Sequence, residues 1–246
     1  MEIYRRIYDI LRDRAARTKV RQLCVGLGYT AVLLDDESVG IAYTWFESKT
    51  SCSLFEDPAD YEGKPALGLL EKIFSEDLLE RSISFAAANA LNRLHSAGFN
   101  DDRGTLLDDL GVREGSRVSM AGYFEPVARE IERRGGQLNV YDIGKGVGSD
   151  TEFYAGLRDH TDVLIVSSTS LIHGSTEELL SHVDPQTPCV LLGPTTPMIP
   201  EAFSHLPVAI LGGTLPLDSD AVLKAIRHAR GTRAIHRASR KVYWKR

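Results

Sequence analysis

Apolar residues repeat with helical spacing at the start of the chain, and β-forming runs follow. The first pattern predicts an amphipathic helix over residues 2–17. Residues 23–34 and 39–46 are rich in β-forming side chains, and the polar segment between them predicts an antiparallel hairpin. Gly26 and Gly28 lie inside the first run, where glycine suggests a bulge or a close approach of another backbone. The apolar positions of the helix are Ile3, Ile7, Ile10 and Leu11.

Two helices are expected after the hairpin. Pro65 suits the first position of a short helix over residues 65–74. Ser75 is a suitable N-cap for a second helix over residues 76–97, which carries its apolar residues on one side. We therefore expect residues 1–97 to form a small α+β domain. Residues 98–116 are rich in Gly and Asp and are expected to form a linker.

Strand-like and helix-like segments alternate regularly from residue 117 to the end. Such alternation predicts a mostly parallel sheet with crossover helices. The apolar runs VLIV and CVLL are typical of strands that are buried on both faces. The expected fold class is therefore α/β, with a Rossmann-like domain over residues 117–246 that follows the small α+β domain. The predicted strands are residues 117–124, 137–144, 162–169, 189–193 and 208–213, and the predicted helices are 125–135, 151–160, 175–183, 200–206 and 218–231.

Composition and charge exclude several classes of function. The chain has 246 residues, of which 43% are hydrophobic and 26% charged, as in ordinary soluble proteins. Its net charge of −5 argues against a nucleic-acid partner. There is no apolar run long enough for a bilayer, no signal-peptide core and no CxxC pair, so we expect a protein of the reducing cytoplasm without a disulfide framework. A homodimer is compatible with the chain.

The end of the chain is basic. Nine Lys or Arg residues and no Asp or Glu follow Asp220. One interpretation is a surface that contacts an anionic partner. The other is a last helix with cations at the negative end of its dipole, followed by a solvated tail.

Ligands of open α/β sheets bind outside the carboxyl ends of the strands. This rule selects five loops, whose Gly, Ser and Thr residues let a ligand approach the backbone and offer neutral hydrogen bonds. The expected partner is therefore a small molecule. The loops are residues 122–126, 142–144, 167–176, 193–196 and 212–214.

The first of these loops argues against a dinucleotide cofactor. Such a site needs three glycines, whereas Gly122 is followed by bulky Tyr123 and Phe124. A methyltransferase-like nucleoside site remains open, because Asp142 ends the second strand and could accept from ribose hydroxyls. Alternatively, Asp142 caps a local turn.

Residues 144–149 resemble a phosphate loop, but the lysine precedes the last glycine, so a flexible surface loop is the better interpretation.

The third loop contains a capping box and a histidine. Ser175 and Glu178 have the spacing of a helix N-cap with its partner three residues on. The same helix start could bind an anion. His173 lies just before this cap and is either a proton-transfer group or a surface histidine.

Asparagine, histidine and serine residues bear on further kinds of site. Asn89 and Asn92 share a helix face and serve either as buried hydrogen-bond anchors or as a wall of the ligand cleft. The seven histidines are dispersed, so no metal site is expected from this chain alone. No serine lies in a G-x-S-x-G elbow, which argues against an α/β-hydrolase.

The chain resembles a family called "putative heavy-metal chelation" proteins, whose function is unknown. The motifs that carry the resemblance are GLGYT (26–30), NALN (89–92), residues 118–126, STSLIHGSTEELL (168–180) and LGPTTP (192–197). They occur in the same order over nearly the full length. His173 stands where the resemblance leads us to expect Asn, so a role that needs an amide there is not carried over.

The resemblance implies a first domain similar to the small domain of enolases and a second that is Rossmann-like and similar to methyltransferases. It also implies an active site between the two domains. Heavy-metal chelation in the family name suggests the synthesis of a chelating small molecule.

Three functions follow as hypotheses. The first is an enzyme of condensation or hydrolysis that acts on a pterin-, flavin- or siderophore-like compound in the synthesis or handling of a metal chelator. The second is a non-catalytic binder or chaperone for a heavy metal or metal chelate. The third is a methyltransferase-like protein that binds S-adenosylmethionine. The sequence leaves the choice between enzyme and binder open, as it does the cofactor. His173 and Asp142 are the candidate catalytic residues, and the candidate ligand-binding residues are Asn89, Gly122, Tyr123, Phe124, Ser168, Thr169, Gly174, Thr176, Gly193, Pro194, Thr195 and Thr196.

Overall fold

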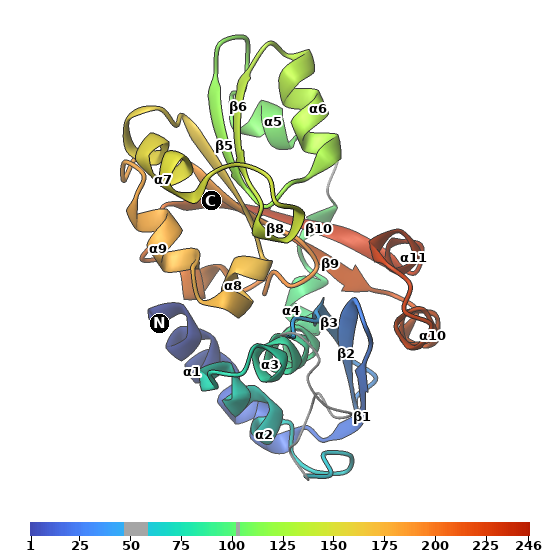
Figure 1. The fold of residues 1–246 in the computed structure, drawn as a ribbon. Coiled ribbons are helices and arrows are strands. Elements are labelled where there is room, and N and C mark those ends of the chain that lie inside the picture. The colour runs from blue at the N-terminus through green and yellow to red at the C-terminus, as the bar shows by residue number, and fades with distance from the viewer. Residues whose placement is uncertain (47–58, 102–103) are drawn as a thin grey trace.

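A computed structural model describes residues 1–46, 59–101 and 104–246 of the chain. Within these residues the chain forms a three-stranded antiparallel sheet and a mostly parallel seven-stranded sheet (Figure 1). Helices accompany both sheets. The α/β fold class expected from the sequence is confirmed, including the order of a small unit followed by a larger parallel one.

The small sheet is built from three strands, where the sequence pattern predicted two. The predicted first strand is broken at Gly26–Gly28 by a turn, in which the N–H of Gly26 donates to the carbonyl of Tyr29 (3.0 Å). A Cβ on Gly26 would lie 2.6 Å from the carbonyl oxygen of Ile226, so glycine lets another helix approach this turn. The expected hairpin is present after the turn. The strands are β1 (Val20–Val25), β2 (Tyr29–Leu34) and β3 (Val39–Tyr43), in the order β1-β2-β3.

The helices of the small unit agree only partly with the prediction. The first, α1, spans Glu2–Arg17 as expected. The segment predicted as one helix from Pro65 forms α2 (Leu67–Leu70) and a 3-10 helix, η1 (Glu71–Phe74). The next helix, α3, spans Leu78–Leu91 and is followed by the short α4 (Arg93–Ser96).

The predicted Ser75 cap of α3 is wrong. Asp77 is the N-cap, and its carboxylate accepts from the N–H groups of Leu79 (2.7 Å) and Glu80 (3.0 Å). The Ser75 hydroxyl instead accepts from the N–H of Asp77 (3.1 Å), so it supports the turn before the helix.

Small residues let α3 lie directly on β3. A Cβ on Gly40 would be 2.0 Å from the backbone nitrogen of Ala90 and 2.3 Å from the carbonyl of Ala86. The alanine-rich stretch 86–90 and Gly40 therefore form one close backbone contact. This contact fixes the helix that carries Asn89 and ends at Asn92.

The seven-stranded sheet has the order β4-β10-β9-β8-β7-β5-β6. All five predicted strands of the second unit are present, and they pair in parallel as β6-β5-β7-β8-β9. β10 and β4 add antiparallel pairs at one edge. The strands are β4 (Asn100–Asp101), β5 (Arg117–Ala121), β6 (Gln137–Tyr141), β7 (Val163–Ser167), β8 (Cys189–Leu192), β9 (Val208–Pro216) and β10 (Ser239–Lys245).

The helices of this unit follow the predicted alternation. A short helix, α8, lies inside the segment that was expected to be a loop after β7, and the predicted helix after β8 is a 3-10 turn. The elements are α5 (Leu106–Asp109), α6 (Glu125–Arg133), η2 (Ile143–Lys145), α7 (Asp150–Asp159), α8 (Thr169–His173), α9 (Thr176–Ser181), η3 (Pro200–Phe203), α10 (Ser219–Arg227) and α11 (Thr232–His236).

The C-terminal part of the chain differs most from expectation. The basic end is β10, which pairs along β9, so the predicted solvated tail is wrong. Residues 212–214 lie within β9, paired with β10, and do not form a loop. In the predicted linker, Leu107 and Val112 pack against the large sheet.

The capping box predicted at Ser175 is also absent. The Ser175 side chain makes no cap hydrogen bond to α9. The neighbouring Glu177 accepts from the N–H of Ile3 at the start of α1 (2.7 Å). The start of α9 therefore makes a tertiary contact with α1.

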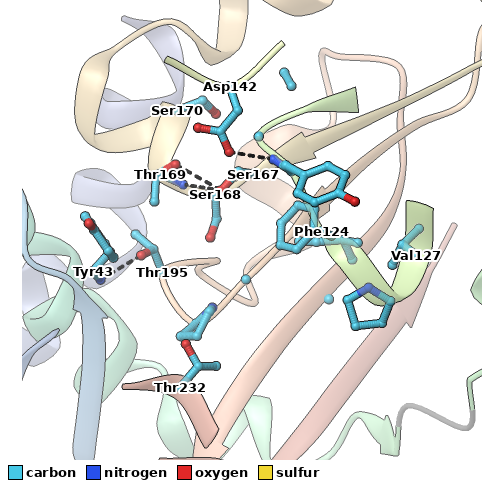
Figure 2. Close-up of a pocket in the computed structure, with 18 of the residues that line it drawn as sticks. Tyr43, Phe124, Val127, Asp142, Ser167, Ser168, Thr169, Ser170, Thr195 and Thr232 are labelled. Carbon is cyan, nitrogen blue, oxygen red and sulfur yellow. Dashed lines mark hydrogen bonds between the residues drawn. The ribbon is translucent and has the colours of Figure 1, made fainter. Parts of the chain in front are cut away.

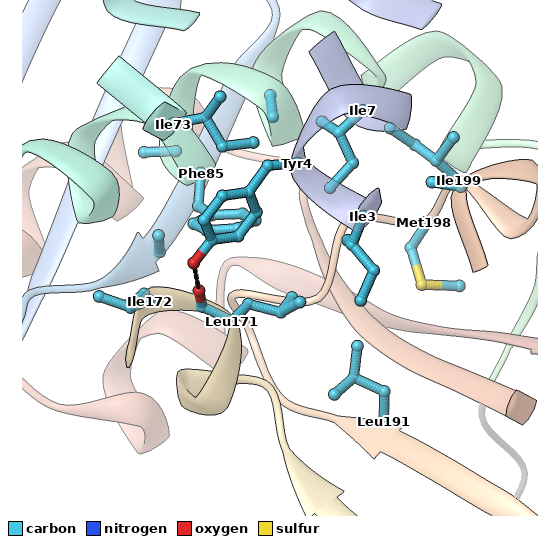
Figure 3. Packing of buried hydrophobic residues seen from close by; sticks show 14 of the residues in the cluster. Ile3, Tyr4, Ile7, Ile73, Phe85, Leu171, Ile172, Leu191, Met198 and Ile199 are labelled. Carbon is cyan, nitrogen blue, oxygen red and sulfur yellow. Dashed lines mark hydrogen bonds between the residues drawn. The ribbon is translucent and has the colours of Figure 1, made fainter. Parts of the chain in front are cut away.

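One hydrophobic core joins the two units. Ile3, Tyr4 and Ile7 of α1 pack against Leu171 and other buried residues that follow the strands of the large sheet (Figure 3). On the opposite face of the small sheet, α10 packs on residues of β1–β3. The small sheet is thus covered on both faces, once by its own helices and once by a helix of the second unit (Figure 1).

The contact between Gly40 and α3 can be tested by overpacking. We expect Gly40→Ala to lower the free energy of unfolding by at least about 1–3 kcal/mol, because the new methyl group must displace helix backbone. The control is Gly28→Ala, which meets nothing within 4 Å. That variant should change stability by less than about 0.5 kcal/mol. Urea denaturation measures both, and equal effects would refute the close-contact explanation.

Candidate functional site

A cleft of about 1260 Å³ lies along the carboxyl ends of the parallel strands and is lined by both units. Along the chain, β6 is added on one side of β5, whereas β7, β8 and β9 are added on the other side. The crevice between β5 and β7 is therefore the topological switch point, where open α/β sheets bind ligands. Residues from the loops after β5, β6, β7 and β8 line the cleft together, as the sequence predicted for this edge of the sheet.

Hydroxyl side chains form the floor at this switch point. Gly122 has a φ of +91°, and a Cβ there would lie 2.6 Å from the Cβ of Ser167, so only glycine brings the two loops together. The Ser167 and Thr169 hydroxyls share a hydrogen bond (2.9 Å). In Figure 2 Ser168 lies between Thr195 and Phe124. The floor therefore offers hydroxyl groups to a ligand.

Asp142 connects two loops of the cleft. One carboxylate oxygen accepts from the N–H of Tyr123 (2.7 Å), the dashed line at Asp142 in Figure 2. The other accepts from the N–H of Lys145 (3.1 Å). The Lys145 ammonium group donates to the carbonyl of Tyr123 (2.8 Å). The turn-capping interpretation of Asp142 thus matches the contacts made, and the residue holds the loop after β5 in place. Asp142 also lines the cleft, and its Oδ2 atom is 3.8 Å from the ammonium group of Lys145.

Aromatic rings of the small unit form the wall opposite this floor. Tyr29 and Tyr43 are paired in register between β2 and β3, and their ring centroids are 5.9 Å apart. Tyr43 is 5.8 Å from Trp45, which is 4.0 Å from the ring of His173. Sequence reasoning missed this aromatic wall, defined here as Tyr29, Tyr43 and Trp45. The signal was present as two aromatic residues two positions apart at the end of a predicted strand.

His173 lies at the rim of the cleft as the last residue of α8. Its side chain is exposed on one side and meets Trp45 edge to face on the other. Loss of water on that side lowers the pKa of His173 below its ordinary value of 6.5, and the positive charge of Arg81 lowers it further. The neutral imidazole is therefore favoured near pH 7, which is the form that accepts a proton.

Four predicted site residues lie outside the cleft lining. Gly174 ends α8 with a φ of +81° beside Arg81, and the Thr176 hydroxyl shares a buried hydrogen bond with Ser170 (2.7 Å). Thr196 is buried, with a hydroxyl that finds no partner among the described residues. Asn89 is the fourth. Predicted residues that do line the cleft are Gly122, Tyr123, Phe124, Asp142, Ser168, Thr169, His173, Gly193, Pro194 and Thr195.

Asn89 and Asn92 both act as anchors between the units. The Asn89 amide donates to the carbonyls of Ile41 (2.9 Å), Pro194 (3.3 Å) and Thr195 (3.3 Å). The Asn92 amide donates to the carbonyl of Met198 (2.6 Å). Of the two interpretations considered from the sequence, these contacts fit the buried anchor.

Thr195 links the same loop to the aromatic wall. Its hydroxyl accepts from the N–H of Tyr43 (2.9 Å), as Figure 2 shows. The loop after β8 is thereby fixed to the last residue of β3. Gly193 in this loop has a φ of +131°, and a Cβ there would meet the Ser168 hydroxyl at 2.6 Å.

The described residues also bear on metal binding and on membrane insertion. Within residues 1–46, 59–101 and 104–246, no three His, Cys, Asp or Glu side chains gather closely enough to hold a metal ion. No helix in the described part of the chain combines the length and apolar character needed to cross a bilayer. Cys24 and Cys189 are buried free thiols, and Cys52 lies outside the described residues.

The anchoring role of Asn92 can be tested by truncation. We expect Asn92→Ala to cost about 1–3 kcal/mol of unfolding free energy, because the buried Met198 carbonyl loses its donor. Asn139→Ala, at an exposed position of β6, is the matched control and should cost less than about 0.5 kcal/mol. Urea denaturation distinguishes them, and an unaffected Asn92→Ala protein would contradict the anchor.

The environment of His173 can be tested by NMR titration. We expect its pKa to lie below 6.5 and to rise toward that value in Trp45→Ala, because water then reaches the ring. A lowered pKa in the folded protein means that protonation favours unfolding, so this group removes stability as the pH falls below 6.5. Trp244→Phe, a change away from the cleft lining, should leave the titration unaltered. An unshifted pKa in the parent protein would refute the packing argument.

Comparisons with known proteins agree with the fold and extend over the whole chain. Crystal structures of two proteins of unknown function are similar: one from Pyrococcus horikoshii (TM-score 0.83, 21% identity, 100% of both chains) and one from Desulfitobacterium hafniense (TM-score 0.79, 18% identity, 98% of this chain and 99% of the other). An uncharacterized protein from Methanocaldococcus jannaschii is 23% identical over 260 residues, which cover 98% of this chain and 95% of that protein.

Family models match both units. Residues 8–92 match one model and residues 105–245 another, and both models carry the description "Putative heavy-metal chelation". The second match alone covers more than half of the chain, which confirms the resemblance seen in the motifs. The chain belongs to the family described as "Putative heavy-metal chelation", for which no specific activity is shown.

Proposed function

We propose that this protein binds a planar, ring-containing metabolite in the cleft between its two units. The observation that carries the proposal is the aromatic wall of Tyr29, Tyr43 and Trp45, which borders the same cleft as the hydroxyl floor of residues 167–169. Apolar, aromatic walls with a few converging polar groups are typical of small-molecule sites. A ring that lies against the aromatic wall would place its polar edge near the hydroxyl floor.

The chemistry supported best is that of an enzyme of condensation or hydrolysis. His173 supplies a neutral imidazole at the rim, suited to accept a proton from a ligand or water. Ser168 and Thr169 orient the ligand, and Asp142 positions the loop after β5 while offering its remaining lone pairs.

The compound classes follow from the ring chemistry and the family description together. Pterins, flavins and catechol-type siderophores combine a flat aromatic ring with oxygen or nitrogen atoms along one edge, and these edges chelate metals. A protein that makes or modifies such a compound would contribute to metal chelation through its product. This accounts for the family description without a ligand set on the protein.

The proposal predicts a change in Trp45 fluorescence on ligand binding. The chain has two tryptophans, and Trp244→Phe leaves Trp45 as the only one. We expect pterin, riboflavin or 2,3-dihydroxybenzoate to quench this fluorescence, with calorimetry giving the affinity. Trp45→Leu should weaken binding roughly five- to tenfold, because aromatic contacts contribute about 0.5–1.5 kcal/mol beyond the buried area.

Other outcomes would redirect the proposal. If no ring compound binds at millimolar concentration, or if Trp45→Leu binds as tightly as Trp244→Phe, the aromatic cleft is not the site. Stoichiometric metal that remains after dialysis would favour a metal binder. Heat on addition of S-adenosylmethionine would favour the methyltransferase-like function.

A further inference from the structure

Basic side chains line the end of the cleft formed by α11 and β10. Arg233, His236 and Arg237 have spacings of three and four residues, so they share one face of α11 and the residue after it. Lys241 lies on β10, opposite Thr214 of β9. All four residues line the same cleft as the aromatic wall. We call Arg233, His236, Arg237 and Lys241 the basic wall.

Contacts with both units hold the basic wall in place. The Tyr29 hydroxyl, from the aromatic wall, shares a hydrogen bond with the hydroxyl of Thr232 at the start of α11 (2.6 Å). Ile235 is buried in the cluster that joins α10 to the small sheet. His236 contacts the Thr214 hydroxyl (3.4 Å). The basic and aromatic walls are therefore adjacent parts of one built surface.

Among the described residues, no carboxylate neutralises the charge on the basic wall. Arg233, Arg237 and Lys241 are exposed, and none has a carboxylate within ion-pair distance in the described part of the chain. Other cations of the cleft differ in this respect. Arg134 pairs with Asp108 (2.6 Å) and Glu130 (2.8 Å).

The described acidic residues that line the cleft do not compensate this charge either. Glu130 is held by Arg133 and Arg134, and Asp142 is held by two backbone N–H groups. Asp150 is on α7, beside Tyr141 and Tyr154 after β6, whereas α11 and β10 lie at the other end of the sheet. The basic wall thus leaves local positive charge in a protein whose net charge is −5.

We propose that the basic wall is a subsite for an anionic group, a carboxylate or a phosphate, carried by the ring compound of the proposed function. Arginine presents a planar fork of donors that matches both kinds of oxyanion, and lysine adds a point charge. The Thr214 and Thr232 hydroxyls beside the wall add neutral donors. The ligand would then be an acidic ring compound, with its ring at Trp45 and its acid group at Arg233, Arg237 and Lys241.

The experiment compares pairs of ring compounds that differ only in the acid group. Riboflavin against flavin mononucleotide tests a phosphate, and catechol against 2,3-dihydroxybenzoate tests a carboxylate. Calorimetry with the full chain should show at least one acidic member binding roughly tenfold more tightly than its neutral partner. In the triple variant Arg233→Gln, Arg237→Gln, Lys241→Gln, this preference should disappear while the neutral partner binds as before.

A charge-matched control separates a local site from net charge. Lys224→Gln, Arg227→Gln and Arg230→Gln remove the same charge from exposed positions on and after α10 that do not line the cleft. This control should keep the preference for the acidic member. Equal loss in both triple variants, or no preference in the parent protein, would overturn the subsite.

Inorganic pyrophosphate distinguishes failure of the subsite from failure of the proposed function. If no ring compound binds, pyrophosphate that binds the parent and the control but not the Arg233, Arg237 and Lys241 variant would support the basic wall alone. Ring compounds that bind without an acid preference would support the proposed function and refute the basic wall. Absence of binding by both kinds of probe would refute both.

Discussion

Irregular backbone at the carboxyl ends of a parallel sheet is buried in this protein, and its carbonyl groups must find donors. The small unit covers the loops after β7 and β8, and four of its side chains supply those donors. Arg81 and Asn89 lie on α3, Asn92 is the residue at its C-cap, and Tyr4 lies on α1. They donate to the carbonyls of Leu171, Ile172, Pro194, Thr195 and Met198. A buried carbonyl without a donor would cost about 1–3 kcal/mol, so this set of bonds makes the packing of the two units specific.

The same constraint shapes the cleft. Because the loop after β8 is fixed by Asn89 and Asn92, Thr195 can accept from the N–H of Tyr43 and hold the aromatic wall beside the hydroxyl floor. Hydrophobic burial of α1 stabilises the contact but does not depend on the exact orientation of the two units. The hydrogen bonds are directional and therefore set the position of one unit relative to the other. The cleft is therefore largely formed before any ligand binds, which lowers the entropic cost of binding.

The parallel sheet and α1 could be predicted from the sequence because burial of one or two faces of an element produces a regular pattern of apolar residues. The prediction failed where tertiary contacts override local signals. β10 was missed because basic residues surround Val242, which alone is buried in that strand. Ser175 and Glu178 satisfied every local requirement of a capping box, yet the helix start is used to receive α1. Gly26 and Gly28 suggested a bulge or a close approach of another backbone, and the carbonyl of Ile226 makes that approach at Gly26. The turn that interrupts the strand there was not predicted.

The candidate site, like the fold, was only partly predictable from the sequence. Asp142 and Asn89 have the residue types of catalytic or binding groups, and their polar atoms are engaged by backbone of neighbouring loops. A polar side chain is available to a ligand only if its atoms are not already hydrogen-bonded to the protein. Whether they are depends on the three-dimensional structure and cannot be seen in the residue type. Within the described part of the chain, no hydrogen bond or ion pair engages the exposed edge of His173 or the basic side chains of Arg233, Arg237 and Lys241. The last three fall in a segment that sequence patterns treated as a helix end and a tail. Recognition of an acidic ring compound would then depend on residues from the end of the chain, held in place by Tyr29 of the small sheet.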